Sequence, residues 1–450
     1  DRNGNKLAVS VDVSSVFINP AEVRDSGKAE QVARELANVL QLDRERIEQR
    51  IARQTAFEWI KRKVRDEEAQ QIRELDLPGV YLTNESDRVY PRADLAARVL
   101  GFTGVDNQGL EGIEFQYDEQ LRGKNGKIIV EYDARSHQIP QATHRYIPPQ
   151  DGLDVMLTID ETIQYFAERE LEKALVRSQA QEGRIIVMDP RTGGILAMAV
   201  RPSFDLNEWQ TSDQKLWRNS IVSNSYSPGS VFKPITAAAA IEKGIVTPQT
   251  PFYDNGRFKA PGHTITNWNG AGLGATNFAE GFESSANTIF ARVAVDLGMD
   301  NFYEALEHFG FMQTTGIDLP GEANGIRPPK ERASILDLAI MGFGQTLTVT
   351  PIQMIGAIAA IANDGKWMRP HLLKALLDEN GNVVKEFESG PGRQVVSEKT
   401  AETVRSLMEK VVDEGTGRRA QIQGYRIGGK TGTTEKVTAG RLEKGKYISS

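Results

Sequence analysis

The sequence of 450 residues contains no cysteine, and this absence removes several kinds of chemistry at once. Disulfide bonds, cysteine nucleophiles and zinc–thiolate sites are all excluded. The histidines show no metal-ligand spacing, so we predict neither a metal nor another cofactor. These histidines are His137, His144, His263, His308 and His371. Walker and dinucleotide-binding glycine motifs are missing as well, which argues against a nucleotide-dependent enzyme.

The sequence also lacks a long hydrophobic run and an excess of positive charge. The best apolar stretch, at residues 354–362, has about half of the ~18 residues that a membrane span needs. The formal net charge is −7 and neither part of the chain is basic, so we predict no nucleic-acid partner. We interpret both ends, at Asp1 and Ser450, as cut, which leaves open an anchor upstream.

Turn residues divide the chain into two parts. Proline, aspartate and glycine cluster at residues 147–152, so we place a boundary there, between a domain at 1–148 and a larger one at 149–450. The first part shows helical spacing at 27–42 and 62–75 and a short strand at 80–82.

The second part mixes strands and helices. Strands are predicted at 154–159, 184–188, 195–200, near 425–427 and from 446 onwards, and helices at 160–177 and 235–243. Turn chemistry at 189–194 makes the second and third of these strands an antiparallel hairpin. Strands from both ends of a domain with helices between them predict an α+β fold.

A Pro-Gly pair breaks the chain directly before Ser230, and residues 235–243 then read as a helix. Ser230 therefore lies near a helix N-terminus, where free N–H groups favour developing negative charge. Lys233 follows one helical turn later on the same face. A buried lysine can take the proton of a serine if desolvation lowers the lysine pKa, so this pair predicts a serine nucleophile with a lysine base.

An S-x-x-K pattern is weak alone, because ordinary residue frequencies give about one in a chain of this length. A second copy at residues 212–215 lacks both the Pro-Gly break and the apolar helix, and we interpret it as a solvated loop. The chain has one S-x-N, at Ser285-Ala286-Asn287, and one K-T-G, at Lys430-Thr431-Gly432. The three motifs in this order are the signature of serine penicillin-recognising enzymes.

With these motifs, the chain resembles a class B penicillin-binding protein, a monofunctional peptidoglycan D,D-transpeptidase. Further matching motifs are Asp1-Arg2-Asn3-Gly4, Arg88-Val89-Tyr90-Pro91, and the segments 109–114, 315–322, 342–345 and 350–351. The compact N-terminal part resembles the division and sporulation branch. The resemblance implies a penicillin-binding, serine β-lactamase-like domain with an antiparallel sheet and helices on both faces. It also implies an elongated, non-catalytic α+β domain before it, and a last strand and helix after Ser450.

The resemblance implies roles for the first two motifs. Ser230 would attack the carbonyl of the penultimate D-alanine of a stem pentapeptide, and Lys233 would accept its proton. Ser285 would relay a proton to the leaving D-alanine, and Asn287 would hold Lys233 and the substrate amide. An amine from a neighbouring stem would then attack the acyl-enzyme, and β-lactams would acylate the same serine.

The third motif would recognise the substrate. Lys430 would attract the substrate carboxylate and favour a neutral Lys233, and the hydroxyl groups of Thr431 and Thr433 on either side of Gly432 would bind that carboxylate. The backbone N–H groups of Ser230 and Thr433 would form the oxyanion hole. The resemblance further implies an anchor that holds the protein at the extracytoplasmic face of a bacterial membrane, and a glycan polymerase as partner of the N-terminal domain.

Two alternatives stay open at this point. A D,D-carboxypeptidase or β-lactamase would use the same serine but would activate water, and no glutamate motif of the class A type is present. A β-lactam sensor, or a scaffold with a weak site, would keep the fold without turnover. Serine as a plain helix cap is the bland interpretation of Ser230.

Overall fold

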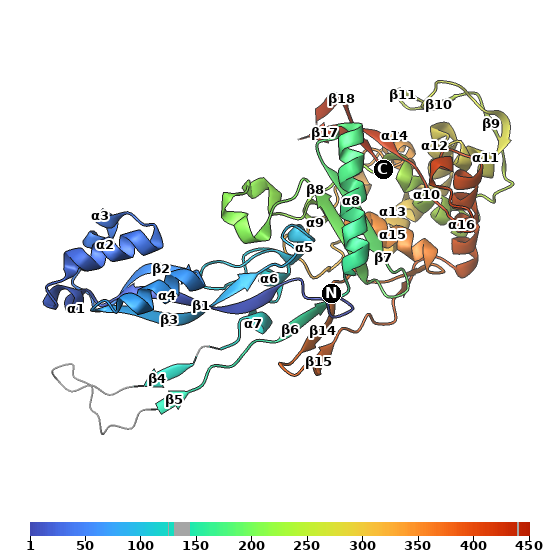
Figure 1. Ribbon diagram of the computed structural model, residues 1–450. Helices are drawn as coiled ribbons and strands as arrows, with labels where there is room; N and C mark the ends of the chain where they lie inside the picture. Colours follow the sequence, from blue (N-terminus) through green and yellow to red (C-terminus); the bar gives the residue numbers. More distant parts are fainter. Residues whose placement is uncertain (125, 130–144, 439–440) are drawn as a thin grey trace.

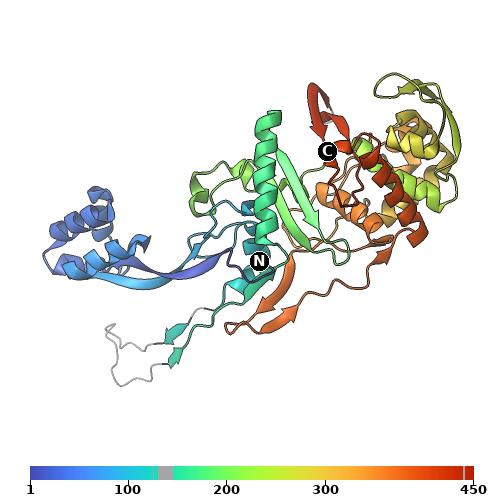
Figure 2. The ribbon, with the colours of Figure 1, turned by 45° about the vertical axis from the view of Figure 1, so that its right-hand side comes forward.

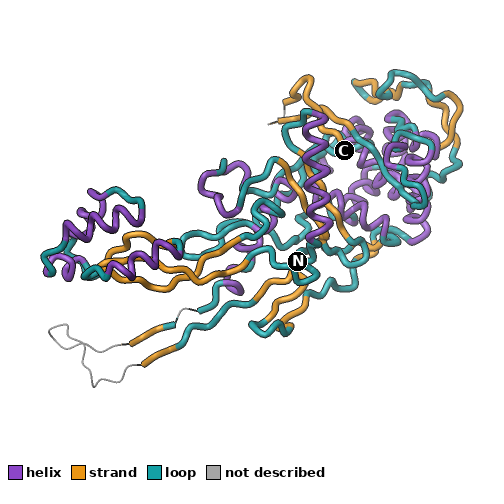
Figure 3. The backbone as a smooth tube through the Cα atoms, viewed as in Figure 1, coloured by secondary structure: helices purple, strands orange, loops and turns teal. Residues whose placement is uncertain are grey.

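We analysed a computed structural model, which describes residues 1–124, 126–129, 145–438 and 441–450. His137 and His144 lie outside these residues. Two parts are visible: an elongated N-terminal part, and a larger part in which helices gather at the end away from it (Figure 1). Figure 3 shows the same division by secondary structure, with most helices of the larger part on one side. Among the described residues, no helix has the length and apolar character that crossing a membrane requires.

The N-terminal part is built on a three-stranded antiparallel sheet. Strand β1 (Val9–Ile18) lies between β2 (Glu58–Val64) and β3 (Val80–Val89), and it pairs with β3 over ten consecutive residues. Helices cover one face of this sheet, namely α1 (Pro20–Asp25), α2 (Ala29–Leu40), α3 (Arg44–Ile51) and α4 (Asp66–Leu75). Val32, Leu36 and Leu40 lie on one stripe of α2 and are buried in the core beneath, as the predicted helix requires.

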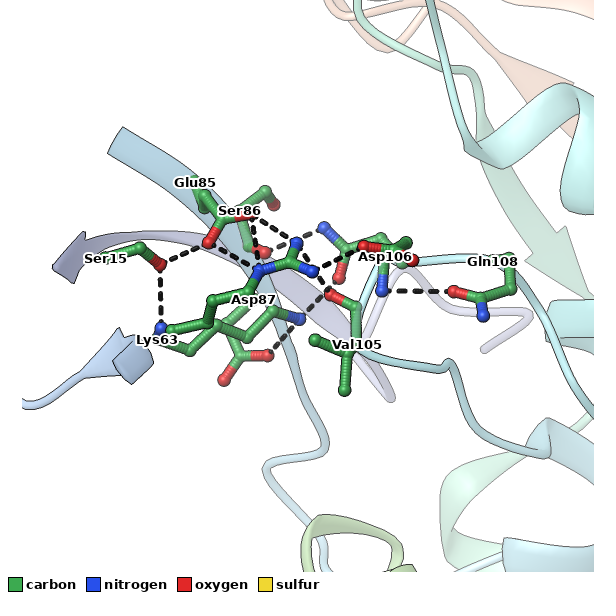
Figure 4. A network of polar contacts seen from close by, with 10 residues as sticks. Ser15, Lys63, Glu85, Ser86, Asp87, Val105, Asp106 and Gln108 are labelled. Atoms are coloured by element: carbon green, nitrogen blue, oxygen red, sulfur yellow. Dashed lines mark hydrogen bonds and ion pairs between the residues drawn. The ribbon is translucent and has the colours of Figure 1, made fainter. Parts of the chain in front are cut away.

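The helix predicted at 62–75 begins later than expected, so that boundary was wrong. Residues 62–64 belong to strand β2, and α4 starts at Asp66. The charged run suits a strand because Arg62 and Lys63 meet carboxylates from β3: Arg62 bonds Glu85, and Lys63 lies 2.9 Å from Asp87 (Figure 4). Arg62 also reaches Asp106 at 2.5 Å, which ties the sheet to the loop that leads towards the second part.

Two of the N-terminal motifs meet where the parts join. Arg88 of β3 forms an ion pair with buried Glu114 at 2.7 Å, and the Tyr90 hydroxyl donates to the same carboxylate at 3.4 Å. The short helices here are α5 (Ala97–Leu100), α6 (Gly112–Gln116) and α7 (Asp118–Leu121). Strands β4 (Lys127–Ile129) and β5 (Arg145–Ile147) pair with each other. The domain boundary at 148/149 stays a prediction.

The predicted helix and hairpin of the second part are confirmed. Helix α8 (Glu161–Ser178) begins after Asp160, whose carboxylate accepts from the backbone N–H groups of Thr162 and Ile163. It packs along the hairpin of β7 (Gly183–Met188) and β8 (Ile195–Arg201), as Figure 2 shows. A second small sheet joins β6 (Asp154–Leu157), β14 (Leu373–Leu377) and β15 (Val383–Glu386).

A helical core fills the end of the molecule that lies away from the N-terminal part. Its central helix, α10 (Lys233–Glu242), is buried over its first eight residues. The helices around it are α11 (Phe278–Glu283), α12 (Asn287–Leu297), α13 (Met299–His308), α14 (Ile335–Met341), α15 (Pro351–Ala362) and α16 (Glu398–Asp413). The remaining helical segments are α9 (Ser220–Ser223) and the 3₁₀ turns η1 (Leu206–Thr211), η2 (Gln214–Leu216), η3 (Gly229–Phe232), η4 (Lys330–Arg332) and η5 (Arg418–Ala420).

An arm of short strands leaves this core between α10 and α11. Its elements are β9 (Pro251–Asp254), β10 (Arg257–Ala260), β11 (His263–Thr266) and β12 (Gly274–Asn277). Strand β9 pairs with β12 and β10 with β11, all antiparallel. Strands β13 (Lys366–Trp367) and β16 (Arg393–Gln394) form another short pair.

Two strand predictions near the C-terminal end were wrong. Residues 425–427 form no strand; the strand begins at Thr433 as β17 (Thr433–Thr438) and pairs with β18 (Arg441–Ser449). Residues 446–449 are therefore the end of a strand and not its start. Within the described part of the chain, the β7–β8 and β17–β18 hairpins are separate ladders, while the predicted mixture of helices and antiparallel strands is present.

Candidate active site

The predicted nucleophile lies on a turn that opens the buried central helix. Ser230 is the second residue of η3, and α10 continues directly from Lys233. The first N–H groups of such a turn have no partner inside the helix, so the Ser230 N–H is free to face a ligand. The Ser230 side chain is half-buried, and no described residue forms a hydrogen bond with its hydroxyl.

The segment 342–345 supports this turn from beneath. The Gly229 N–H donates to the Gly344 carbonyl at 2.8 Å, and the Thr236 hydroxyl donates to the Gly342 carbonyl at 2.9 Å. Gly344 has φ +79°, and a Cβ atom there would lie 2.1 Å from the Gly229 carbonyl oxygen. Only glycine allows this close approach, which explains a glycine directly under the nucleophile.

Lys233 is fully buried and points at the second motif. Its Nζ donates to the Ser285 carbonyl at 2.7 Å, to the Ser285 hydroxyl at 3.1 Å and to Asn287 Oδ1 at 2.8 Å. The ring of Phe290 lies 5.3 Å away. All of these partners are neutral, and no carboxylate of the described residues forms an ion pair with Lys233.

This environment makes Lys233 a base. Burial, and next the positive charge of Lys430, hold the pKa of Lys233 well below its ordinary value. Burial also lowers the pKa of Lys430, to about 8. Near neutral pH Lys430 thus keeps most of its charge, while Lys233 loses its proton far more easily than a solvated lysine does. Lys233 follows Ser230 by three residues, across the junction of η3 and α10.

The second motif is held in a strained backbone. Ser285 follows α11 with φ +57°, the left-handed region that is unfavourable for a residue with a side chain. Such strain costs on the order of 1–3 kcal/mol and is typical of functional sites. It turns both the carbonyl and the hydroxyl of Ser285 towards Lys233 and lets Asn287 start α12.

The third motif lies against the nucleophile turn. A Cβ atom on Gly432 would be 3.0 Å from a side-chain atom of Val231 and 3.2 Å from its backbone nitrogen, so β17 passes directly beside η3. Gly432 and Ser450 exchange two backbone hydrogen bonds, of 2.6 and 3.0 Å. Bonded and non-bonded pairs alternate in an antiparallel ladder, so Thr433 points its N–H away from β18, along the edge that η3 adjoins.

The side chains of the third motif form few hydrogen bonds with other described residues. Lys430 is half-buried and donates to the Thr431 carbonyl at 2.9 Å, and the Thr431 hydroxyl donates to the Thr416 hydroxyl at 3.1 Å. Thr433 is exposed at the start of β17. The structure thus brings all three motifs together from residues 230, 285 and 430 of the sequence.

Comparison with known proteins agrees with this geometry. Residues 183–450 match the family described as the penicillin binding protein transpeptidase domain, and residues 1–157 match the penicillin-binding protein dimerisation domain. The chain belongs to the class B penicillin-binding proteins. Its residues 183–450, which include all three motifs, are a transpeptidase domain.

Relatives of this penicillin-binding protein are named for sporulation and for peptidoglycan cross-linking. It is 38% identical to "Stage V sporulation protein D" of Bacillus subtilis, over 100% of this chain and 70% of that protein. It is 32% identical to "Peptidoglycan D,D-transpeptidase FtsI" of Escherichia coli, over 100% and 74%. A peptidoglycan synthetase structure from Bifidobacterium adolescentis superposes with a TM-score of 0.78, at 25% identity, over 97% of this chain and 84% of that one.

Sequence reasoning missed several residues of this penicillin-binding protein's site. Thr416 bonds Thr431 across fifteen residues, and the sequence offers no signal for this contact. Asp254, Asn267 and Thr288 form a buried polar cluster behind Asn287, although each alone reads as an ordinary turn or helix residue. For Gly344 the sequence does offer a signal, because segment 342–345 resembles a family motif.

Proposed function

We propose that this protein is a peptidoglycan D,D-transpeptidase in which Ser230 forms the acyl-enzyme. The observation that supports it most is Lys233, a fully buried lysine three residues after Ser230 whose pKa is lowered by burial and by Lys430. It has no ion-pair partner among the described residues. A neutral amine at this place can accept the proton of the serine hydroxyl. Removal of a base of this kind typically costs 10²–10⁴-fold in rate.

The first step acylates the serine. Ser230 Oγ bonds to the carbonyl carbon of the penultimate D-alanine while its proton passes to Lys233. The C–N bond to the terminal D-alanine breaks, and the leaving nitrogen takes this proton from Lys233 through the hydroxyl of Ser285. Ser285 suits this relay because its hydroxyl oxygen lies 3.1 Å from Lys233 Nζ.

The acyl-enzyme is then released to an amine. The acceptor nitrogen of a neighbouring stem bonds to the acyl carbon and gives one proton to Lys233. The ester bond to Ser230 then breaks as Ser230 Oγ takes this proton from Lys233. The N–H groups of Ser230 and Thr433 carry the oxyanion in both steps. Lys430 and the hydroxyl groups of Thr431 and Thr433 bind the substrate carboxylate.

The site shows no carboxylate placed to activate water, within the part of the chain that the structure describes. A hydrolase needs a group that activates water for deacylation, and a carboxylate is the usual choice. Among the described residues, no aspartate or glutamate forms a hydrogen bond with Ser230, Lys233, Ser285 or Asn287. This argues against a β-lactamase that activates water with a carboxylate of the class A type. The reaction products, tested below, distinguish a transpeptidase from a carboxypeptidase.

We also propose where the protein works and with what. A membrane anchor holds it at the extracytoplasmic face of the membrane, where the stem peptides are. Residues 1–148 serve as a non-catalytic domain that binds a glycan polymerase, and residues 149–450 carry the reaction. Failure of the full-length protein to co-purify with such a polymerase from membranes would contradict the second part of this proposal.

The reaction itself is tested with a stem pentapeptide that ends in D-Ala-D-Ala, together with a stem peptide that offers a free amine. We expect an amide-linked dimer and one free D-alanine per dimer, measured by mass spectrometry. Release of D-alanine with only the tetrapeptide as second product would indicate a carboxypeptidase. Absence of any D-alanine release would support the sensor or scaffold alternative.

A further inference from the structure

A buried carboxylate near the second motif has no part in the proposed reaction. Asp254 ends β9, in the arm of short strands, and only 4% of its surface is exposed. No arginine or lysine of the described residues forms an ion pair with it. A carboxylate that is buried without a cation is costly to keep, so its hydrogen bonds must compensate for the lost water.

The Asp254 carboxylate accepts four hydrogen bonds in place of water. One carboxylate oxygen accepts from the Gly256 N–H and from the Thr288 hydroxyl, both at 2.8 Å. The other accepts from Asn267 Nδ2 at 2.8 Å and from the Leu273 N–H at 3.1 Å. Burial alone would raise the pKa of Asp254, but these bonds outweigh it and leave the pKa below its ordinary value. The Asp254 carboxylate is thus a fixed anion that holds four hydrogen-bond donors in place.

Two of these donors, Asn267 and Thr288, also contact each other at the start of α12. Asn267 Oδ1 accepts a hydrogen bond from the Thr288 N–H at 3.2 Å. It also lies 3.1 Å from the Thr288 hydroxyl oxygen, whose proton it shares with Asp254. Ala286 precedes the helix and has no side-chain oxygen, so Asn267, from the arm, caps α12 in its place. The negative charge of Asp254 beside this helix start also suits the helix dipole.

Asn287 lies between the capped residue and the strained Ser285. Its Oδ1 accepts from Lys233, and its Nδ2 donates to the Thr266 carbonyl at 3.4 Å. Thr266 is the residue before Asn267, so one arm segment contacts both Asn287 and its neighbour Thr288. The position of the Asn287 amide relative to Lys233 therefore depends on where the arm is held.

We propose that Asp254 is a positioning residue for catalysis, which acts through Asn267 and Thr288 to fix Asn287 against Lys233. This inference rests on the proposed roles of Lys233 and Asn287. Misplacement of a catalytic group by about 1 Å can cost on the order of 10²-fold in rate. Loss of the anion should therefore slow acylation while the nucleophile, its base and the substrate carboxylate site are all still present.

The test measures acylation of the full chain by a fluorescent penicillin at several drug concentrations, which separates noncovalent binding from the first-order acylation constant. We expect Asp254→Asn to lower the acylation constant by about 10- to 100-fold, with a smaller change in binding. Asp318→Asn is the matched control, because Asp318 is also buried and accepts three hydrogen bonds, from Tyr117, Leu372 and Leu373. Both variants should lose thermal stability, and only the first should lose acylation rate.

A second pair of variants decides the case if Asp254→Asn does not fold. Thr288→Val removes the hydroxyl that bonds Asp254 and keeps the shape, whereas Thr288→Ser keeps the hydroxyl. The valine variant should acylate at least tenfold more slowly than the serine variant. Equal acylation constants in the two variants, or in Asp254→Asn and Asp318→Asn, would overturn the inference. A wild-type protein that forms no adduct would instead contradict the proposed function.

Discussion

Two groups of cations, one in each part of this molecule, have opposite surroundings. In the N-terminal part, Arg62 and Lys63 are matched with Glu85, Asp106 and Asp87. In the transpeptidase domain, Lys233 is buried with neutral hydrogen-bond partners, and the charge that shifts its pKa is the like charge of Lys430. The first arrangement fixes a structure, and the second prepares a proton transfer.

The pKa values follow this division. Burial alone would raise the pKa of Glu85, but hydrogen bonds from Arg62 and Ser15 hold it below its ordinary value. The hydrogen bonds of Arg62 to Glu85 and Asp106 raise the pKa of Arg62. Burial lowers the pKa values of Lys233 and Lys430 instead. Unmatched, shifted groups that share a pocket mark a reactive centre more reliably than paired ones. The following predictions test whether the difference is real, starting with the largest effect.

Removal of the unmatched lysine should have the largest effect. Lys233→Met keeps the length and apolar fit of the side chain but leaves no base, so acylation by penicillin should fall by about 10³-fold or more. Lys243→Met, at the other end of the same helix, removes only an exposed ion pair with Glu304 and should acylate normally. Similar rates in both variants would mean that Lys233 is not the base.

Removal of the like charge should change the pH profile as well as the rate. In wild type, acylation should rise with pH as Lys233 loses its proton and fall again around the Lys430 pKa of about 8. Lys430→Gln takes away a charge that lowers the pKa of Lys233, so the acidic limb should move to higher pH and the basic limb should disappear. We expect a loss of about 10- to 100-fold at pH 7. An unchanged acidic limb would contradict the electrostatic coupling.

A steric change beneath the nucleophile should have a smaller effect. Gly344→Ala would push the Gly229 carbonyl and tilt η3, and we expect acylation to slow about tenfold. Gly381→Ala is its control, because Gly381 has the same φ of +79° and open space around it. The two variants pay the same backbone strain, so a difference in acylation isolates the contact under Ser230.

In the N-terminal part, breaking a matched pair should change stability alone. Glu85→Gln leaves the partly buried Arg62 without its main partner and should cost about 1–3 kcal/mol of unfolding free energy at pH 7. Because the folded pKa of Glu85 is lowered, its contribution is present above the unfolded value of about 4.3 and is lost as pH falls through the folded one. Denaturant unfolding at pH 7 and pH 3 checks this. A change in acylation beyond twofold would contradict the division of roles.

The sequence predicted the parts of this structure that local patterns control. The start of α8 follows from Asp160, a capping residue next to an amphipathic run, and the Ser230–Lys233 spacing follows from one helical turn. The predictions were wrong where pairing with a distant strand decides the local structure. Residues 62–64 became a strand because β1 offers a ladder. Residues 425–427, where Tyr425 is 75% exposed, have no such partner strand in the described part of the chain.

The supporting residues of the site were beyond sequence reasoning for a related reason. Asp254 draws its donors from positions up to 34 residues away, on several elements of the fold. Its neighbours in sequence give it the look of a turn residue. The left-handed backbone at Ser285 is equally invisible, because nothing in S-x-N itself demands a positive φ.

The central claim is that Ser230 is acylated and that the acyl-enzyme is hydrolysed slowly. Intact-mass spectrometry after incubation with penicillin tests it directly, in wild type and in Ser230→Ala. We predict a single stable adduct on the wild type and none on the variant. An adduct that persists in Ser230→Ala, or a wild-type protein that destroys the drug without retaining it, would contradict the account.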